Sequence, residues 1–102
     1  MDRVAMLNEI LAENPGDAFA RYGLALEYSK AGDVQSAMQE FAKLLADHPE
    51  YVPGYFMAAQ TLAAASRNDE ARKMLTDGIA HARQAGNSHA QSEMEAMLAD
   101  LG

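Results

Sequence analysis

The fold is decided by residues 18–51, which read AFARYGLALEYSKAGDVQSAMQEFAKLLADHPEY. This stretch is rich in Ala, Leu, Met, Glu and Gln, which are strong helix formers, and it has no long run of β-branched residues. Gly32-Asp33 interrupts it in the middle, and His48-Pro49 closes it. We therefore predict two helices, at 17–31 and 34–47, and the short loop between them predicts antiparallel packing.

The same alternation of helix-forming segments and breaks extends over the whole chain of 102 residues. Further helices are predicted at 2–13, 52–65, 69–85 and 88–100. The predicted amino-terminal caps are short polar side chains: Asp2, Asp17, Asp33, Asp69 and Ser88. Ser88 and Gln91 have the spacing of a capping box, and Pro53 suits a first helical turn. Gly32 and Gly86 suit the left-handed position that ends a helix. The expected architecture is therefore all-α, with about six antiparallel helices in one domain.

A period of 34 residues runs through the chain. Pro15 and Pro49 are separated by this interval, and so are Tyr22 and Phe56. The other matched positions fall on several helices: Ala25 with Ala59, Ala37 with Ala71, Tyr28 with Leu62, Leu7 with Phe41 and Leu75, and Leu11 with Leu45 and Ile79. Because the class of side chain is kept at a fixed interval on several helices, the pattern predicts a structural repeat.

Residues 18–51 resemble the tetratricopeptide repeat, whose pattern contains Trp, Leu-Gly, Tyr, Ala, an aromatic residue and Pro at set spacings. The matching positions hold Leu24-Ala25, Tyr28, Ala37, Phe41 and Pro49, with Gly32-Asp33 at the turn. Arg21 stands where the family usually has Trp. The resemblance implies an α-α superhelix (a solenoid) made of an N-terminal half-repeat helix (1–17), two full repeats (18–51 and 52–85) and a C-terminal capping helix (86–102).

The second repeat matches the family less closely than the first. Gly78 occupies a position where a small residue is expected, in keeping with the pattern. Arg83 replaces the closing Pro of residues 52–85. We therefore expect the fifth helix to run on without the usual break.

The charge balance excludes several classes of partner. The chain has eight Lys and Arg against fifteen Asp and Glu, which gives a formal net charge of −7. Nucleic acids and anionic membrane surfaces are bound through basic surfaces, so neither is expected as a partner. Cysteine is absent, which excludes disulfides and thiol chemistry and fits a cytoplasmic location. No run of about eighteen apolar residues occurs that could cross a membrane.

Catalytic, cofactor and metal sites are not expected either. His48, His81 and His89 are scattered and lack the spacing that brings two imidazoles to one metal ion. The serines lack a nucleophile motif, and the isolated glycines form no phosphate-binding loop. The sequence therefore predicts a protein that is not an enzyme.

The helix at 17–31 has apolar side chains on two opposed sides, whereas a surface helix normally has one apolar stripe. One stripe belongs to the repeat core. By the resemblance, the other falls on the positions that line the concave groove of tetratricopeptide-repeat proteins, where peptides or helices of partner proteins bind. The candidate partner-binding residues are Phe19, Tyr22, Leu26, Ser29 and Lys30 on this helix, and Phe56 and Gln60 on the helix at 52–65.

Some relatives hold a ligand carboxylate with Lys, Arg and Asn side chains on the inner helices. Tyr22, Leu26 and Met57 stand at those places here, so no carboxylate clamp is expected. Apolar anchors are expected to hold the ligand instead. Lys30 and Gln60 would add polar contacts.

Two functions from different classes follow from these observations. The first is an adaptor or scaffold that binds a protein or peptide partner in the groove. The second is a self-associating structural module that forms a homodimer through the groove or the terminal helix. The last helix is amphipathic, with Met94, Met97, Leu98 and Leu101 at helical spacing, so it either caps the superhelix or docks on a second copy. The groove residues could instead be ordinary core, covered by the first or the last helix.

Overall fold

The computed structural model describes residues 2–102. Within this range the chain forms six α-helices and no strand: α1 (Arg3–Glu13), α2 (Ala18–Lys30), α3 (Val34–Asp47), α4 (Val52–Ala64), α5 (Asn68–Gln84) and α6 (Ser88–Leu101). Every predicted helix is present, and each end lies within one residue of its predicted place. The predicted all-α fold is therefore confirmed.

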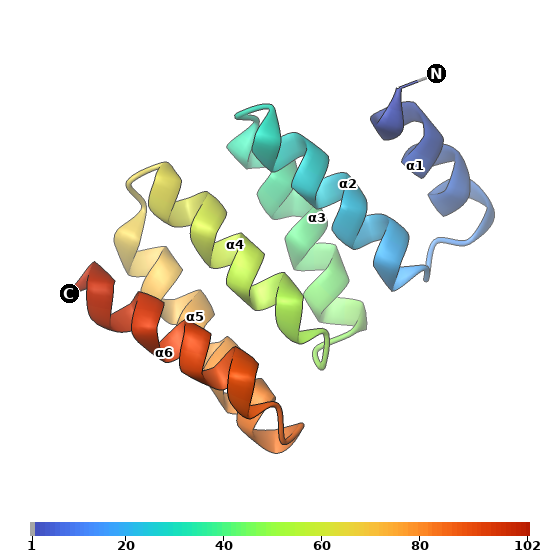
Figure 1. The fold of residues 1–102 in the computed structure, drawn as a ribbon. Helices are drawn as coiled ribbons and strands as arrows, with labels where there is room; N and C mark the ends of the chain where they lie inside the picture. The colour runs from blue at the N-terminus through green and yellow to red at the C-terminus, as the bar shows by residue number, and fades with distance from the viewer. Residues whose placement is uncertain (1) are drawn as a thin grey trace.

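Successive helices stack side by side into a short superhelix (Figure 1). In this view α2, α4 and α6 lie in front, α3 passes behind α2, and α5 passes behind α4 and α6. The main packing pairs are the hairpins α2/α3 and α4/α5, followed by α5 with α6. The helices α2, α4 and α6 therefore form one wall of the molecule, which we call the inner wall.

Residues matched by the 34-residue period occupy equivalent places in the core. Ala25 in α2 and Ala59 in α4 are both completely buried, and so are Phe41 in α3 and Leu75 in α5. The small residues let the helix axes approach closely, and the large ones fill the space between layers. The period thus corresponds to a repeated packing unit.

Three of the predicted caps are confirmed. Asp2, Asp17 and Asp33 each accept a hydrogen bond from the backbone N–H three residues further on. The predictions for Ser88 and Asp69 are wrong. Asn87 caps α6 by accepting from the Ala90 amide, so Ser88 is already helical and its capping box does not form. The helix α5 begins at Asn68, which places Asp69 inside the first turn, where its charge meets the positive end of the helix dipole.

The two glycines predicted to end helices take the left-handed conformation, and one serine does so as well. Gly32 and Gly86 have φ values of 79° and 70°, in the left-handed region. Ser66, which follows Gly32 by one repeat, adopts a φ of 62° without the freedom of glycine. The helix α5 has 17 residues against 14 in α3 and continues to Gln84, as expected when the closing Pro is absent.

Gly78 marks a close approach of three helices. A Cβ atom added to this residue of α5 would lie 2.6 Å from the Cβ of Tyr55 in α4 and 2.7 Å from the Sδ of Met94 in α6. Both distances are far below van der Waals contact. The position therefore has room only for glycine, which satisfies the expectation of a small residue.

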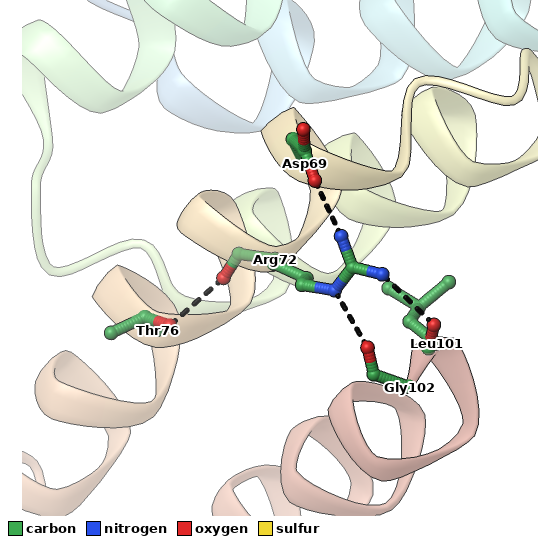
Figure 2. Close-up of polar contacts among 5 residues, drawn as sticks. All are labelled: Asp69, Arg72, Thr76, Leu101 and Gly102. Atoms are coloured by element: carbon green, nitrogen blue, oxygen red, sulfur yellow. Dashed lines mark hydrogen bonds and ion pairs between the residues drawn. The ribbon is translucent and has the colours of Figure 1, made fainter.

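The carboxyl end of α6 is held by Arg72 of α5 (Figure 2). The Arg72 Nη2 donates to the Leu101 carbonyl at 3.0 Å, and Nε donates to the backbone oxygen of Gly102 at 3.2 Å. The third nitrogen, Nη1, donates to Asp69 at 2.6 Å. A cation is favourable at the negative end of a helix, so this residue ties the last turn of α6 to α5.

Candidate functional site

The candidate residues of α2 differ in exposure along the helix. Phe19, at its amino end, is 76% exposed, and Lys30, at its carboxyl end, is also exposed. Lys30 pairs weakly with Glu27, with 3.7 Å between Nζ and the carboxylate. Leu26, between them, is half-buried against the core that α2, α3 and α4 share. The two ends of the α2 face are therefore open to solvent, and its centre is partly packed.

Tyr22 is half-buried and lies against Tyr51, which precedes α4. The ring centroids are 5.2 Å apart, and the ring planes are inclined by 51°. Burial raises the pKa of both phenols, helped at Tyr22 by Tyr51 and at Tyr51 by the charge of Asp17. Both side chains are therefore neutral at physiological pH and able to donate hydrogen bonds. Tyr51 was not among the predicted residues.

Ser29 and Gln60 meet at a hollow of about 430 Å³ between α2 and α4. Its other lining residues are Gly32, Val34, Met57, Thr61, Ala64 and Ala65. The Thr61 hydroxyl donates to the Met57 carbonyl at 2.8 Å, so the 2.7 Å contact between Ser29 and Thr61 is a bond in which Ser29 donates. The Ser29 oxygen is left as an acceptor at the rim of the hollow.

Phe56 faces a different neighbour. It lines a smaller hollow of about 110 Å³ with Val52, Pro53, Ala90 and Glu93, the last two on α6. Its ring is half-buried and packs against the core that α4, α5 and α6 share. The structure therefore separates Phe56 from Ser29 and Gln60, although all three belong to the inner wall.

Within residues 2–102, the terminal helices leave most of the inner faces of α2 and α4 uncovered. Among the described residues, α1 contacts α2 alone, and no Cα atom of α6 comes within 8 Å of one in α2. The helix α6 instead buries Met94 and half-buries Met97, Leu98 and Leu101 in the core beside α5. The inner faces of α2 and α4 are thus not sealed by either end of the chain.

Met57 and Thr61 are parts of this surface that the groove assignment did not include. Thr61 is buried, and its contact with Ser29 spans 32 residues, so the 34-residue period does not align the two. The contact arises where one hairpin stacks on the next. The only sequence signal for this contact is the pair of adjacent polar residues, Gln60 and Thr61, in the otherwise apolar α4.

Two other kinds of site are absent from residues 2–102. No cluster of three or more His, Cys, Asp or Glu side chains in this range could hold a metal ion. None of the described helices is both long and apolar enough to cross a membrane. The hollows at Ser29 and Gln60 and at Phe56 are the candidate site because they are the ones lined by predicted groove residues.

Stacked antiparallel hairpins with an uncovered inner wall define the class of helical-repeat proteins. Residues 28–101 match the tetratricopeptide repeat family. The chain belongs to this family, whose fold generally mediates protein–protein interaction and is not a catalytic one.

Individual relatives agree with the family assignment. The chain is 30% identical over 95 residues to a TPR repeat-containing protein of Pseudomonas aeruginosa, which covers 93% of this chain and 90% of that protein. The solution structure of a tetratricopeptide repeat domain protein from Salinibacter ruber has a TM-score of 0.80 and 30% identity, covering 86% of this chain and 89% of that one. A Bordetella parapertussis protein has a TM-score of 0.86 with 21% identity, covering 99% of this chain and 88% of that one, which supports the fold alone.

Proposed function

We propose that this protein is an adaptor or scaffold module that binds a peptide or helix of a partner protein along the inner faces of α2 and α4. The proposal rests on the combination of an exposed aromatic side chain and a partly polar hollow on the same face of α2. A 76% exposed aromatic ring, Phe19, stands at one end of α2, and the hollow at Ser29 and Gln60 lies at the other end. Exposed apolar groups rimmed by polar ones are typical of interaction surfaces.

The chemistry of the surface indicates what a partner must offer. Phe19 and Leu26 favour an apolar side chain of the ligand. Ser29 and Gln60 favour a polar group at the hollow, because the Ser29 oxygen can accept and the Gln60 amide can both donate and accept. Glu93, beside Phe56, favours a basic residue where the ligand reaches α6. The proposed ligand is therefore an amphipathic segment, not an acidic carboxylate terminus.

The division of the chain is part of the proposal. Residues 1–17 act as a half-repeat, 18–51 and 52–85 as full repeats, and 86–102 as a cap. The burial of Met94 beside α5 supports the capping role, because the apolar side of α6 is used within the chain. The lack of cysteine and the net charge of −7 support a cytoplasmic protein that binds neither nucleic acid nor membrane.

The test compares capture of cellular proteins by immobilised wild-type chain and by the variant Phe19→Ser/Gln60→Ala. Both side chains are exposed, so the variant should keep its helical circular dichroism. Tyr22 and Phe56 are unsuitable for this purpose because they are half-buried. Arg83→Ser, an exposed change on α5 away from the inner wall, is the matched control.

The expected result is a specific partner retained by the wild type and the control and reduced at least about tenfold with the inner-wall variant. A peptide from that partner should then show the same order of affinities by titration calorimetry. Equal capture by all three proteins would contradict the proposal. A wild-type chain whose inner wall is consumed by a second copy would favour the homodimer instead, and sedimentation over a concentration series detects that.

A further inference from the structure

Within residues 2–102, the helix α1 lacks a contact that its counterparts make. The helix α3 packs against α2 within its hairpin and against α4 of the next, and α5 packs in the same way against α4 and α6. Among the described residues α1 packs against α2 alone. The side of α1 on which a hairpin partner would lie is therefore uncovered.

The 34-residue period identifies the uncovered residues. Met6 and Ile10 of α1 correspond to Glu40 and Leu44 of α3, which are both buried: Glu40 pairs with Arg21 of α2, and Leu44 lies in the core that α2, α3 and α4 share. In α1 the same positions are 46% and 42% exposed. Apart from Phe19, they are the large hydrophobic side chains that stand exposed among residues 2–102. By contrast, α6 at the other end leaves no large hydrophobic side chain exposed within that range.

The uncovered face of α1 is complementary to itself. Arg3, Met6, Ile10 and Glu13 follow one another at helical spacings of three and four, so they lie along one side of the helix. If a second α1 lies antiparallel across this side, with the two-fold axis at Asn8, Met6 faces the partner's Ile10 and Arg3 faces the partner's Glu13. Both apolar pairs and both charge pairs are then satisfied at once.

We propose that two copies of this chain associate through their α1 helices in this antiparallel register, each α1 serving as the missing hairpin partner of the other. The orientation is that of the hairpins within the chain. The contact is isologous, as in most homodimers. The charges favour a second copy over an unrelated helix. Each α1 has a basic residue, Arg3, at one end and an acidic residue, Glu13, at the other, so two antiparallel copies place opposite charges together at both ends.

The charged ends are available for this contact. Glu13 is exposed, and Arg3 remains 63% exposed although its Nε donates to Glu27 at 3.2 Å. The interface is small, since one helix of 11 residues contributes from each side. Weak association is expected, with a dissociation constant on the order of 100 μM. The contact leaves the inner wall of α2 and α4 free, so it is independent of the proposed partner binding.

The first experiment is sedimentation velocity from about 10 μM to 1 mM. The wild type should shift from monomer to dimer across this range. Ile10→Glu should raise the dissociation constant at least about tenfold, because a carboxylate would enter an apolar contact. Phe19→Glu is the matched control, since it makes the same change of charge at an exposed apolar residue outside α1, and it should leave the dissociation constant unchanged.

The second experiment uses charge reversal. Arg3→Glu and Glu13→Arg should each weaken self-association, because each places like charges opposite one another. An equimolar mixture of the two variants should associate at least as well as the wild type, since opposite charges then meet at both ends. A mixture no better than either variant alone would overturn the proposed register.

Backbone amide chemical shifts separate this proposal from a dimer formed through the inner wall. With rising concentration, the shift changes should map to Arg3, Met6, Ile10 and Glu13. Changes at Phe19, Leu26 and Gln60 would instead overturn the α1 contact and weaken the proposed partner binding. A wild-type chain that stays monomeric at 1 mM would overturn the α1 contact alone.

Discussion

Arg21 and Tyr55 occupy equivalent positions in the two hairpins, and each donates a hydrogen bond to the carbonyl of the equivalent proline. Arg21 Nη2 donates to Pro15 at 3.1 Å, and the Tyr55 hydroxyl donates to Pro49 at 2.6 Å. Apart from this hydrogen bond, the two side chains contact different kinds of residue. Arg21 pairs with Glu40 at 2.7 Å, whereas the Tyr55 ring stacks on His81 with 5.1 Å between ring centroids. The same bond to a proline carbonyl is thus made by a guanidinium in one hairpin and by a phenol in the other.

The Arg21–Glu40 ion pair can be replaced by the residues found one repeat later. Tyr55 is equivalent to Arg21, and Met74 is equivalent to Glu40. Glu40→Met alone should cost about 2 kcal/mol of unfolding free energy, because it leaves Arg21 mostly buried without its partner. Arg21→Tyr/Glu40→Met should lie within about 1 kcal/mol of the wild type. Denaturant unfolding followed by circular dichroism measures both. A double variant as unstable as the single one would refute the equivalence.

Two glycines on helices should respond oppositely to alanine. Gly78→Ala should lower the unfolding free energy by about 1–3 kcal/mol, because the new methyl group would overlap the Cβ of Tyr55. Gly23→Ala should raise it by up to about 1 kcal/mol, since its Cβ would meet Leu7 at an ordinary 3.5 Å and the gain in helix propensity remains. Thermal and denaturant unfolding test the pair. Equal effects of the two substitutions would contradict the packing described for Gly78.

Arg72→Ala should loosen the last turn of α6. The substitution removes both donors to the backbone oxygens of Leu101 and Gly102 and should cost about 1 kcal/mol, since the side chain is one-third exposed. Hydrogen exchange should become faster at the carboxyl end of α6 and stay unchanged in α2. Lys73→Ala, its exposed neighbour, is the control. Unaltered exchange in α6 would mean that apolar packing alone holds the helix.

Stability should fall in alkaline solution. Burial raises the pKa of Tyr22, Tyr51 and Tyr55, so between the unfolded pKa of about 10 and the higher folded values the native state holds more protons than the unfolded state. Their contribution is complete below pH 10 and is lost as the pH rises through the folded pKa values.

The measurement is denaturant unfolding at pH 8.5 and at pH 10.5. Tyr22→Phe/Tyr51→Phe should lose less stability between these two conditions than the wild type, because two of the three phenols are gone. The Tyr55 hydroxyl is left in place because it donates to Pro49. An identical alkaline loss in both proteins would assign the effect to other groups.

Local chemistry made most of the fold predictable. Asp17 and Asp33 cap the helices that they precede, and Gly32 takes the left-handed turn, because these features depend on a few neighbouring residues. The start of α6 was predicted correctly, but its cap was assigned to Ser88 in place of Asn87, for a similar local reason. Asn87 and Ser88 are both good caps, and the turn after Gly86 presents Asn87 to the free amide.

The candidate site was predictable only in part. Phe19 and Phe56 belong to the same pattern of inner-wall positions, yet one is 76% exposed and the other packs against α6. The bond between Ser29 and Thr61 joins separate hairpins and follows no repeat interval. Contacts of this kind depend on how the hairpins stack, which the helical pattern does not specify.

The sequence by itself determined the helices, their turns and the packing of each hairpin, because propensity, capping and the alternation of small and large side chains act over short distances along the chain. The tertiary structure alone decided which faces stay open. Exposure depends on whether a neighbouring helix reaches a side chain, and α6 lies beside Phe56 while nothing described covers Phe19, Met6 or Ile10.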